Sequence, residues 1–182
     1  MKFCEMPYTR PDIDETKKSF DSLTERLASA KSYADAKEVF LEEQKLEKHI
    51  DTLVNLVSIR HSVNTRDKFY DEEKNFWNGA MPELQEYMQK WTGAMLATPF
   101  REDFSAEYGD LMFVNAEISL KAFSPEIIPE LQRENELVQE YEKLLASAQI
   151  PFEGGAYTLS QLSPFKTGAD DAQRLAAWKA EG

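Results

Sequence analysis

The feature that most constrains this chain is the absence of glycine and proline between Asp12 and Asn78. Glycine disfavours helices through its backbone freedom, and proline does so through its missing N–H and a steric clash. Four of the seven glycines instead lie late in the chain, at Gly154, Gly155, Gly168 and Gly182. This distribution predicts long helices in the first part of the chain and a differently built stretch that begins near residue 150.

Capping residues and apolar periodicity predict where these helices lie. Asp12 and Ser32 are each followed three residues later by an acidic residue, so each is expected to cap a helix. A kink or short break is expected at Gly79 and Pro82. The segments predicted to be helical are about 12–31, 32–61, 66–98, 100–123 as one or two helices divided near Gly109, and 125–148, in which Ser124 is the cap and Pro125 the first helical residue.

The C-terminal stretch shows a different periodicity. Ile150-Pro-Phe152, the turn residues 153–155 and Tyr157-Thr-Leu159 alternate as the strands of a small hairpin do, and Asp170 is expected to cap a last helix, 172–180. The predicted fold is therefore mainly α: a multi-helix bundle of long amphipathic helices with one small β-hairpin near the C-terminus. The predicted domains are a helical domain, 1–149, and a segment, 150–182, that holds the hairpin and the start of a further helix.

The same periodicity predicts the core. Five side chains are expected to be substantially buried: Phe40, Leu53, Val57, Phe76 and Trp91. The buried face of the 125–148 helix is expected to consist of Ile127, Leu131, Val138, Tyr141, Leu145 and Ala148.

Charge and composition exclude several classes of function. The formal net charge is −12, which argues against nucleic acid as a partner because phosphate binding needs clustered Lys and Arg. No apolar run approaches the roughly 18 residues of a membrane span, and the chain does not start like a secretion signal. A single cysteine, Cys4, cannot form an internal disulfide. The expected location is the cytoplasm, with no membrane partner.

The two histidines do not have the spacing of a metal site. His49 and His61 lie twelve residues apart, which in one helix separates them by about 18 Å along the axis and about 120° around it. Neither begins a His-Glu-x-x-His motif, and the residues three before them are Leu46 and Ser58 rather than the glutamate of a di-iron bundle. We therefore identify no catalytic, cofactor-binding or metal-binding residue in this chain.

Other chemistry-bearing groups have simpler interpretations. The acidic pairs and triplets at 42–43, 71–73 and 102–103 are interpreted as solvated helix charge, because adjacent residues point to different parts of a helix surface. Cys4 has no base beside it in the sequence that would make it a nucleophile. The aromatic residues Phe76, Trp77, Tyr87 and Trp91 are interpreted as core residues rather than as a peptide groove.

Five stretches carry a resemblance to a known family, which spans roughly residues 3 to 180. They are FCEMPY at 3–8, LVSIRHSVNT at 56–65, FYDEEK at 69–74, LKAFSPEII at 120–128 and YTLSQLSPF at 157–165. Together they resemble the N-terminal region of the oligoendopeptidase F group, within the thimet-oligopeptidase-like zinc metallopeptidases. Members of that family keep their His-Glu-x-x-His helix and a glutamate zinc ligand far downstream of this region.

The resemblance implies that the chain is the non-catalytic N-terminal part of an intracellular enzyme that hydrolyses oligopeptides with zinc. The zinc would belong to the intact parent and not to this fragment, which would continue into a catalytic domain. Its helices would form one wall of the substrate channel. In this fragment the channel face would be exposed, and two copies of the chain could form a homodimer through it. The alternative is a freestanding acidic helical module that binds a protein or peptide partner.

Overall fold

The computed structural model describes residues 3–182, and the side chain of Cys4 lies outside what it describes. The chain forms two compact units, one that reaches to Arg133 and one of Glu134–Gly182. The division into domains at 149/150 stays a prediction. In order, the elements are the 3-10 turn η1 (Phe3–Glu5), α1 (Ile13–Ala28), α2 (Tyr33–Val63), α3 (Lys68–Leu96), α4 (Arg101–Tyr108), α5 (Leu111–Ala122), the 3-10 turn η2 (Pro125–Ile127), α6 (Ile128–Ser147), β1 (Ile150–Phe152), β2 (Gly155–Tyr157), α7 (Leu159–Lys166) and α8 (Asp171–Glu181).

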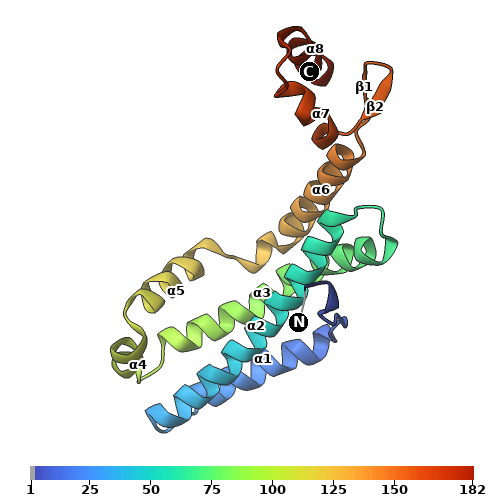
Figure 1. Cartoon of the computed structure of the whole chain (residues 1–182). Helices are drawn as coiled ribbons and strands as arrows, with labels where there is room; N and C mark the ends of the chain where they lie inside the picture. Colours follow the sequence, from blue (N-terminus) through green and yellow to red (C-terminus); the bar gives the residue numbers. More distant parts are fainter. Residues whose placement is uncertain (1–2) are drawn as a thin grey trace. The chain divides into compact units, whose positions relative to one another are not determined.

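The predicted fold class is confirmed: long helices dominate the described residues, and the two-stranded hairpin follows α6 (Figure 1). The first two caps are also confirmed. The Asp12 carboxylate accepts a hydrogen bond from the Glu15 N–H at 3.0 Å, and the Ser32 hydroxyl accepts one from the Asp35 N–H at 3.1 Å. Each bond satisfies an N–H group that has no partner inside the helix, which explains why α1 and α2 begin where they do.

Helix α3 continues without a break through Gly79 and Pro82, where a kink or short break was predicted. A proline inside a helix removes one backbone hydrogen bond. Here the Pro82 ring is buried, and the Gln132 side-chain amide donates to the carbonyl oxygen of Gly79 at 2.9 Å. The buried ring and this side-chain bond both lie at the turn of α3 that contains the proline.

The core of the first unit consists of two clusters. Leu23, Phe40, Trp91, Phe104 and Phe113 belong to the first, to which α1 through α5 all contribute. Phe20, Leu53, Val57, Trp77 and Leu84 belong to the second, which α1, α2 and α3 build. The burial predicted for Phe40, Leu53, Val57 and Trp91 is confirmed. Phe76 is only half-buried, and the Arg10 guanidinium lies over its ring, 4.5 Å from the centroid.

Helices α4 and α5 are separated at Gly109, as predicted. Gly109 has φ of +87°, a backbone conformation that side-chain-bearing residues rarely adopt. The turn lets α5 double back along α3, to which the Gln89 amide ties it by donating to the Ser119 hydroxyl at 3.1 Å. This places the inner face of α5 opposite α2 and α3 in the first cluster.

In the second unit, β1 and β2 pair antiparallel, with Ile150 opposite Tyr157. Ile150 and Phe152 pack with Leu162 and Ala177 in a small core of their own. The cap at Asp170 is confirmed, because its carboxylate accepts from the Ala172 N–H at 2.8 Å. Helix α7 was not predicted. Thr158 and Gln161 form a capping box at its start, where the sequence analysis assigned Thr158 and Leu159 to a strand.

The apolar face predicted for α6 was wrong in most of its residues. Ile127, Val138, Tyr141 and Leu145 are exposed, while Leu131 and Ala148 are half-buried. Periodicity identifies an apolar face but does not say whether the described residues contain its partner. The start of this helix also differs: Ser124 makes no side-chain capping bond, and the 3-10 turn η2 precedes α6.

No helix among residues 3–182 combines the length and apolar character that a membrane crossing requires.

Candidate functional site

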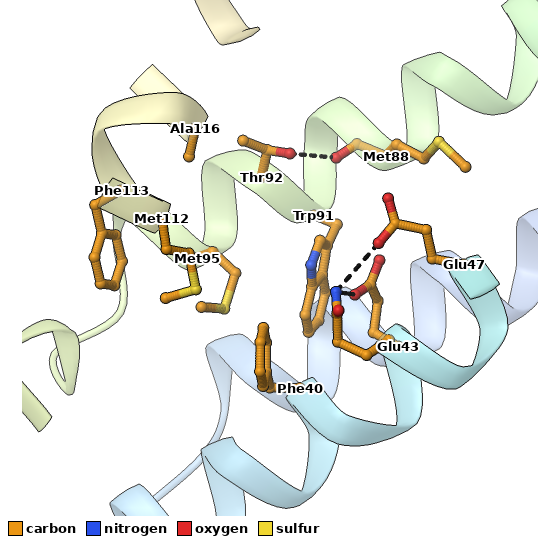
Figure 2. A pocket seen from close by; sticks show the side chains of 11 residues that line it. Phe40, Glu43, Glu47, Met88, Trp91, Thr92, Met95, Met112, Phe113 and Ala116 are labelled. Atoms are coloured by element: carbon orange, nitrogen blue, oxygen red, sulfur yellow. Dashed lines mark hydrogen bonds between the residues drawn. The ribbon is translucent and has the colours of Figure 1, made fainter. Parts of the chain in front are cut away.

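A cavity of about 250 Å³ lies in the first unit between α2, α3 and α5. Figure 2 shows the side chains that line it. Several of these, including Gln44, Glu47, Met88 and Met112, are half-buried, so the cavity is open to solvent. It combines apolar walls with the buried carboxylate of Glu43 and the half-buried carboxylate of Glu47.

Helical spacing assembles this cavity from three helices. Helix α2 contributes Phe40, Glu43, Gln44 and Glu47; α3 contributes Met88, Trp91, Thr92 and Met95; and α5 contributes Met112, Phe113 and Ala116. In each helix the lining residues are three or four apart, or adjacent to one that is, and such residues share one face.

The walls are mainly aromatic and thioether groups. Trp91 and Phe40 are buried in the first core cluster, and Figure 2 shows both among the side chains that line the cavity. Three methionines, Met88, Met95 and Met112, complete the apolar lining. Methionine is flexible and polarizable, so such walls can adapt to the shape of an occupant.

The polar part of the cavity is a pair of glutamates one helical turn apart. Glu43 is only 2% exposed. The Gln44 amide nitrogen donates to Oε2 of Glu43 and to Oε2 of Glu47, both at 3.1 Å (Figure 2). The second oxygen of Glu43, Oε1, has no hydrogen-bond partner among the described residues.

Burial raises the pKa of Glu43 to about 7, and repulsion from Glu47 adds to this effect. The pKa of Glu47 is also raised, mainly by burial and then by the charge of Asp51. Removing a carboxylate from water disfavours its charged form, and a neighbouring negative charge disfavours it further. Glu43 can therefore change its protonation state near neutral pH.

A second buried glutamate of the same unit is satisfied in a different way. Glu73, 4% exposed, accepts from the Arg10 guanidinium at 2.7 Å and from the Tyr8 hydroxyl at 2.5 Å, and the Trp77 indole donates to Tyr8 at 3.1 Å. The Arg10 hydrogen bonds lower the pKa of Glu73. This network joins the N-terminal segment to α3 as a structural tie, and a cation balances its carboxylate.

Both histidines lie on α2, and the structure does not bring them together. His49 is exposed. His61 is fully buried, with Nε2 at 3.3 Å from Oδ1 of Asp71, but neither ring nitrogen makes a well-aligned hydrogen bond in the described part of the chain. Among the side chains that the structure describes, which exclude Cys4, no three His, Asp or Glu gather as metal ligands would.

The interpretation of the acidic clusters as solvated charge was correct for Glu102 and Asp103, which are exposed, and wrong for Glu43 and Glu73. Both buried glutamates occupy positions within the apolar stripe of their helix: Glu43, for example, lies between Val39 and Ile50 at helical spacing. That position was the signal in the sequence that could have identified them.

The four aromatic residues that were interpreted as core residues are not all buried. Trp77 and Trp91 are buried in the core, as predicted, while Phe76 and Tyr87 are half-buried against the second cluster. Trp91 additionally lines the cavity, so one side chain serves both the core and the candidate site.

Comparison with known families places the first unit in a peptidase class. The model of the Peptidase M3 N-terminal domain matches residues 3–123. This match covers all the helices that build the cavity.

Solved structures match nearly the whole chain. An oligoendopeptidase F is 38% identical, with a TM-score of 0.95 over 99% of this chain and 32% of its own. An oligoendopeptidase F from Bacillus anthracis str. Ames is 41% identical, with a TM-score of 0.94 over 99% of this chain and 33% of its own. PZ peptidase A, solved with an inhibitor, is 36% identical, with a TM-score of 0.94 over 98% and 32%.

The curated proteins include no match to this chain. The chain spans about a third of the length of the solved proteins it resembles. It belongs to the M3 peptidase family, and its residues 3–123 are the N-terminal domain of that family. Within the family, the solved structures that match it include two oligoendopeptidases F.

Proposed function

We propose that this chain is the non-catalytic N-terminal part of a zinc metallopeptidase that hydrolyses oligopeptides in the cytoplasm, and that it forms one wall of the substrate channel. The observation that carries the proposal is the match over almost the whole chain to about a third of each oligoendopeptidase F. At 38–41% identity and TM-scores of 0.94–0.95, this likeness supports a shared role for the matched region.

Unpartnered apolar side chains within each unit support a role as one part of a larger molecule. In the first unit, Leu111, Val114 and Ile118 of α5 are exposed. In the second unit, Tyr141 and Leu144 of α6 are exposed. Clustered apolar side chains on a surface often mark an interface, and the rest of a family-length chain would supply the partner.

The described residues do not fit a catalytic zinc ion. Such a site needs three protein ligands and an open position, and no suitable group of three is present in residues 3–182. The proposal therefore assigns the zinc and the hydrolytic step to downstream residues, and assigns substrate access to this chain. The single cysteine is consistent with a reducing compartment.

A chimera tests this assignment. The matched N-terminal third of the Bacillus anthracis oligoendopeptidase F is replaced by residues 1–182, and turnover of a quenched fluorescent oligopeptide is measured. We expect the chimera to cleave the peptide and to leave a folded protein intact, and the same enzyme with that third deleted to be inactive. A chimera that folds, binds zinc and has no peptidase activity would contradict the proposal.

The coding sequence beyond residue 182 separates the proposal from the freestanding module. A downstream His-Glu-x-x-His helix is expected, whereas an immediate stop would favour an acidic module that binds a partner peptide. Homodimerisation through the exposed face stays a prediction, to be measured by sedimentation.

A further inference from the structure

The cavity between α2, α3 and α5 contains one buried carboxylate, Glu43, that no described cation balances. Beside it Glu47 is half-buried, and the charge of Lys48 partly offsets the rise of its pKa. The polar contact of Glu43 is the neutral Gln44 amide, and no Lys or Arg among residues 3–182 pairs with Glu43 or Glu47. A buried carboxylate is costly unless it is paired, protonated or fully hydrogen-bonded. Since Oε1 of Glu43 has no partner, the site can accept a hydrogen-bond donor from outside.

Comparison with Glu73 shows what is missing. In the same unit, Glu73 is buried to a similar degree and receives both a guanidinium and a hydroxyl group. Glu43 receives no such guanidinium or hydroxyl group and lines a cavity together with Trp91, Met95 and Met112. A cation in this cavity could pair with the carboxylates of Glu43 and Glu47 among aromatic and thioether walls.

The walls restrict which cations suit the site. A calcium or magnesium ion takes six or more oxygen ligands, and the cavity offers carboxylates from only two residues amid thioether and aromatic side chains. An organic cation suits it better, because its apolar stem can pack on the methionines while its charged end reaches the carboxylates. The volume of about 250 Å³ accommodates a short aliphatic chain.

We propose that this cavity is a binding site for an organic cation, the ammonium or guanidinium end of an aliphatic chain, which bonds to Glu43 and Glu47 and packs against Trp91 and the methionines. The inference does not depend on the proposed peptidase role. The same chemistry is present in a free alkylamine and in the lysine or arginine side chain of a peptide, so the test includes both sources.

The test uses the ε-methyl NMR signals of methionine in the chain of residues 1–182. Met88, Met95 and Met112 line the cavity, whereas Met6 and Met81 do not, so the chain contains its own spatial control. Hexylammonium is titrated as the cation, hexanol as its neutral counterpart and hexanoate as its anionic counterpart. We expect saturable shifts confined to the three cavity methionines with hexylammonium, and at least about tenfold weaker binding of the other two.

Two peptide-like probes distinguish the sources. N-acetyl-lysine amide and N-acetyl-arginine amide are compared with N-acetyl-norleucine amide, which lacks the charge. Saturable shifts with the basic amides would assign the site to a peptide side chain, while shifts with hexylammonium alone would assign it to a free amine. Both results support an organic-cation site.

Variants tie the binding to Glu43. Glu43→Gln keeps the shape and removes the charge, and it is expected to weaken hexylammonium binding at least about tenfold. Glu38→Gln makes the same change at an exposed position of α2 and is expected to have no effect. Equal binding of hexanol and hexylammonium, unchanged binding by Glu43→Gln, or no shift of the cavity methionines would overturn the proposal.

Binding should also depend on pH. An ammonium keeps its charge from pH 6 to 8, while Glu43 gains its negative charge in this window. The other titratable group facing it is Glu47, on the same helix; the lining residues of α3 and α5 have none. Hexylammonium should bind more tightly at pH 8 than at pH 6, and the opposite order would contradict the site.

Discussion

At the scale of single residues, two buried glutamates in one unit show how neighbours decide the state of a carboxylate. Arg10 lowers the pKa of Glu73, and burial beside Glu47 raises that of Glu43 to about 7. Both positions face inward from a helix, so the difference arises from the groups that other segments bring to them. One glutamate is a structural tie and the other is available to a ligand.

The first prediction concerns stability and pH at Glu43. Its pKa is raised from about 4.5 to about 7 in the folded state, so its contribution is fully present below pH 4.5 and is lost as pH rises through 7. Glu43→Gln removes this pH-dependent loss. The free energy of unfolding of the variant, relative to that of the unmodified chain, should therefore be higher at pH 8 than at pH 5 by on the order of 2 kcal/mol. Urea unfolding of both proteins at the two pH values measures the difference. The exposed Glu38→Gln should show no such dependence, and equal behaviour of the two variants would contradict the prediction.

The second prediction concerns the Arg10–Glu73 tie. Arg10→Met leaves the buried Glu73 carboxylate without its cation and should lower the free energy of unfolding by about 1–3 kcal/mol. Arg26→Met is the matched control, because Arg26 and Glu42 form an ion pair that is largely solvated, so its loss is expected to cost clearly less than the loss of Arg10. Chemical denaturation measures the free energy of unfolding of both variants. An equal decrease in both would mean that the Arg10–Glu73 pair does not stabilise the fold more than a solvated ion pair does.

At the scale of helices, capping residues and apolar periodicity located most helix boundaries. They did not show which apolar helix faces are covered by other helices. Helix α2 is covered on its inward face by α1 and α3 through the second core cluster. Much of the apolar face of α6 is exposed. The periodicity alone does not distinguish the two cases.

The third prediction tests the inward face of α2. Leu53 is buried in the second cluster, so Leu53→Ala should create a cavity and lower the free energy of unfolding by about 2–5 kcal/mol. Ile59→Ala on the same helix is the control: Ile59 is exposed, and a change of about 0.5 kcal/mol or less is expected. The urea midpoints measure both, and a midpoint unchanged by Leu53→Ala would show that this face does not hold the core.

At the scale of the whole molecule, the chain is a portion of a family architecture. Its residues 3–123 match the N-terminal domain of M3 peptidases, and the whole chain matches about a third of the solved oligoendopeptidases F. Exposed apolar side chains on α5 and on α6 are what such a portion is expected to present.

The fourth prediction follows at this scale. Residues 1–182 alone should hold no stoichiometric zinc and should not cleave peptides, because a catalytic site needs three ligands and a base beside the bound water. Mass-spectrometric metal analysis and turnover of a quenched fluorescent peptide measure both properties, with the Bacillus anthracis oligoendopeptidase F as the active control. Chelator-sensitive cleavage by residues 1–182 would refute the assignment of zinc binding and hydrolysis to downstream residues.

The amino-acid sequence by itself determined the helical class, the caps at Asp12 and Ser32, the break at Gly109 and the hairpin at 150–157, because each depends on interactions between residues close in the chain. It also contained the family resemblance. Only the tertiary structure decided that Glu43 is buried without a cation, that Glu73 has Arg10, and that Val138, Tyr141 and Leu145 of α6 are exposed. Burial and ion pairing depend on contacts between segments that are distant in the sequence, and local periodicity does not specify those contacts.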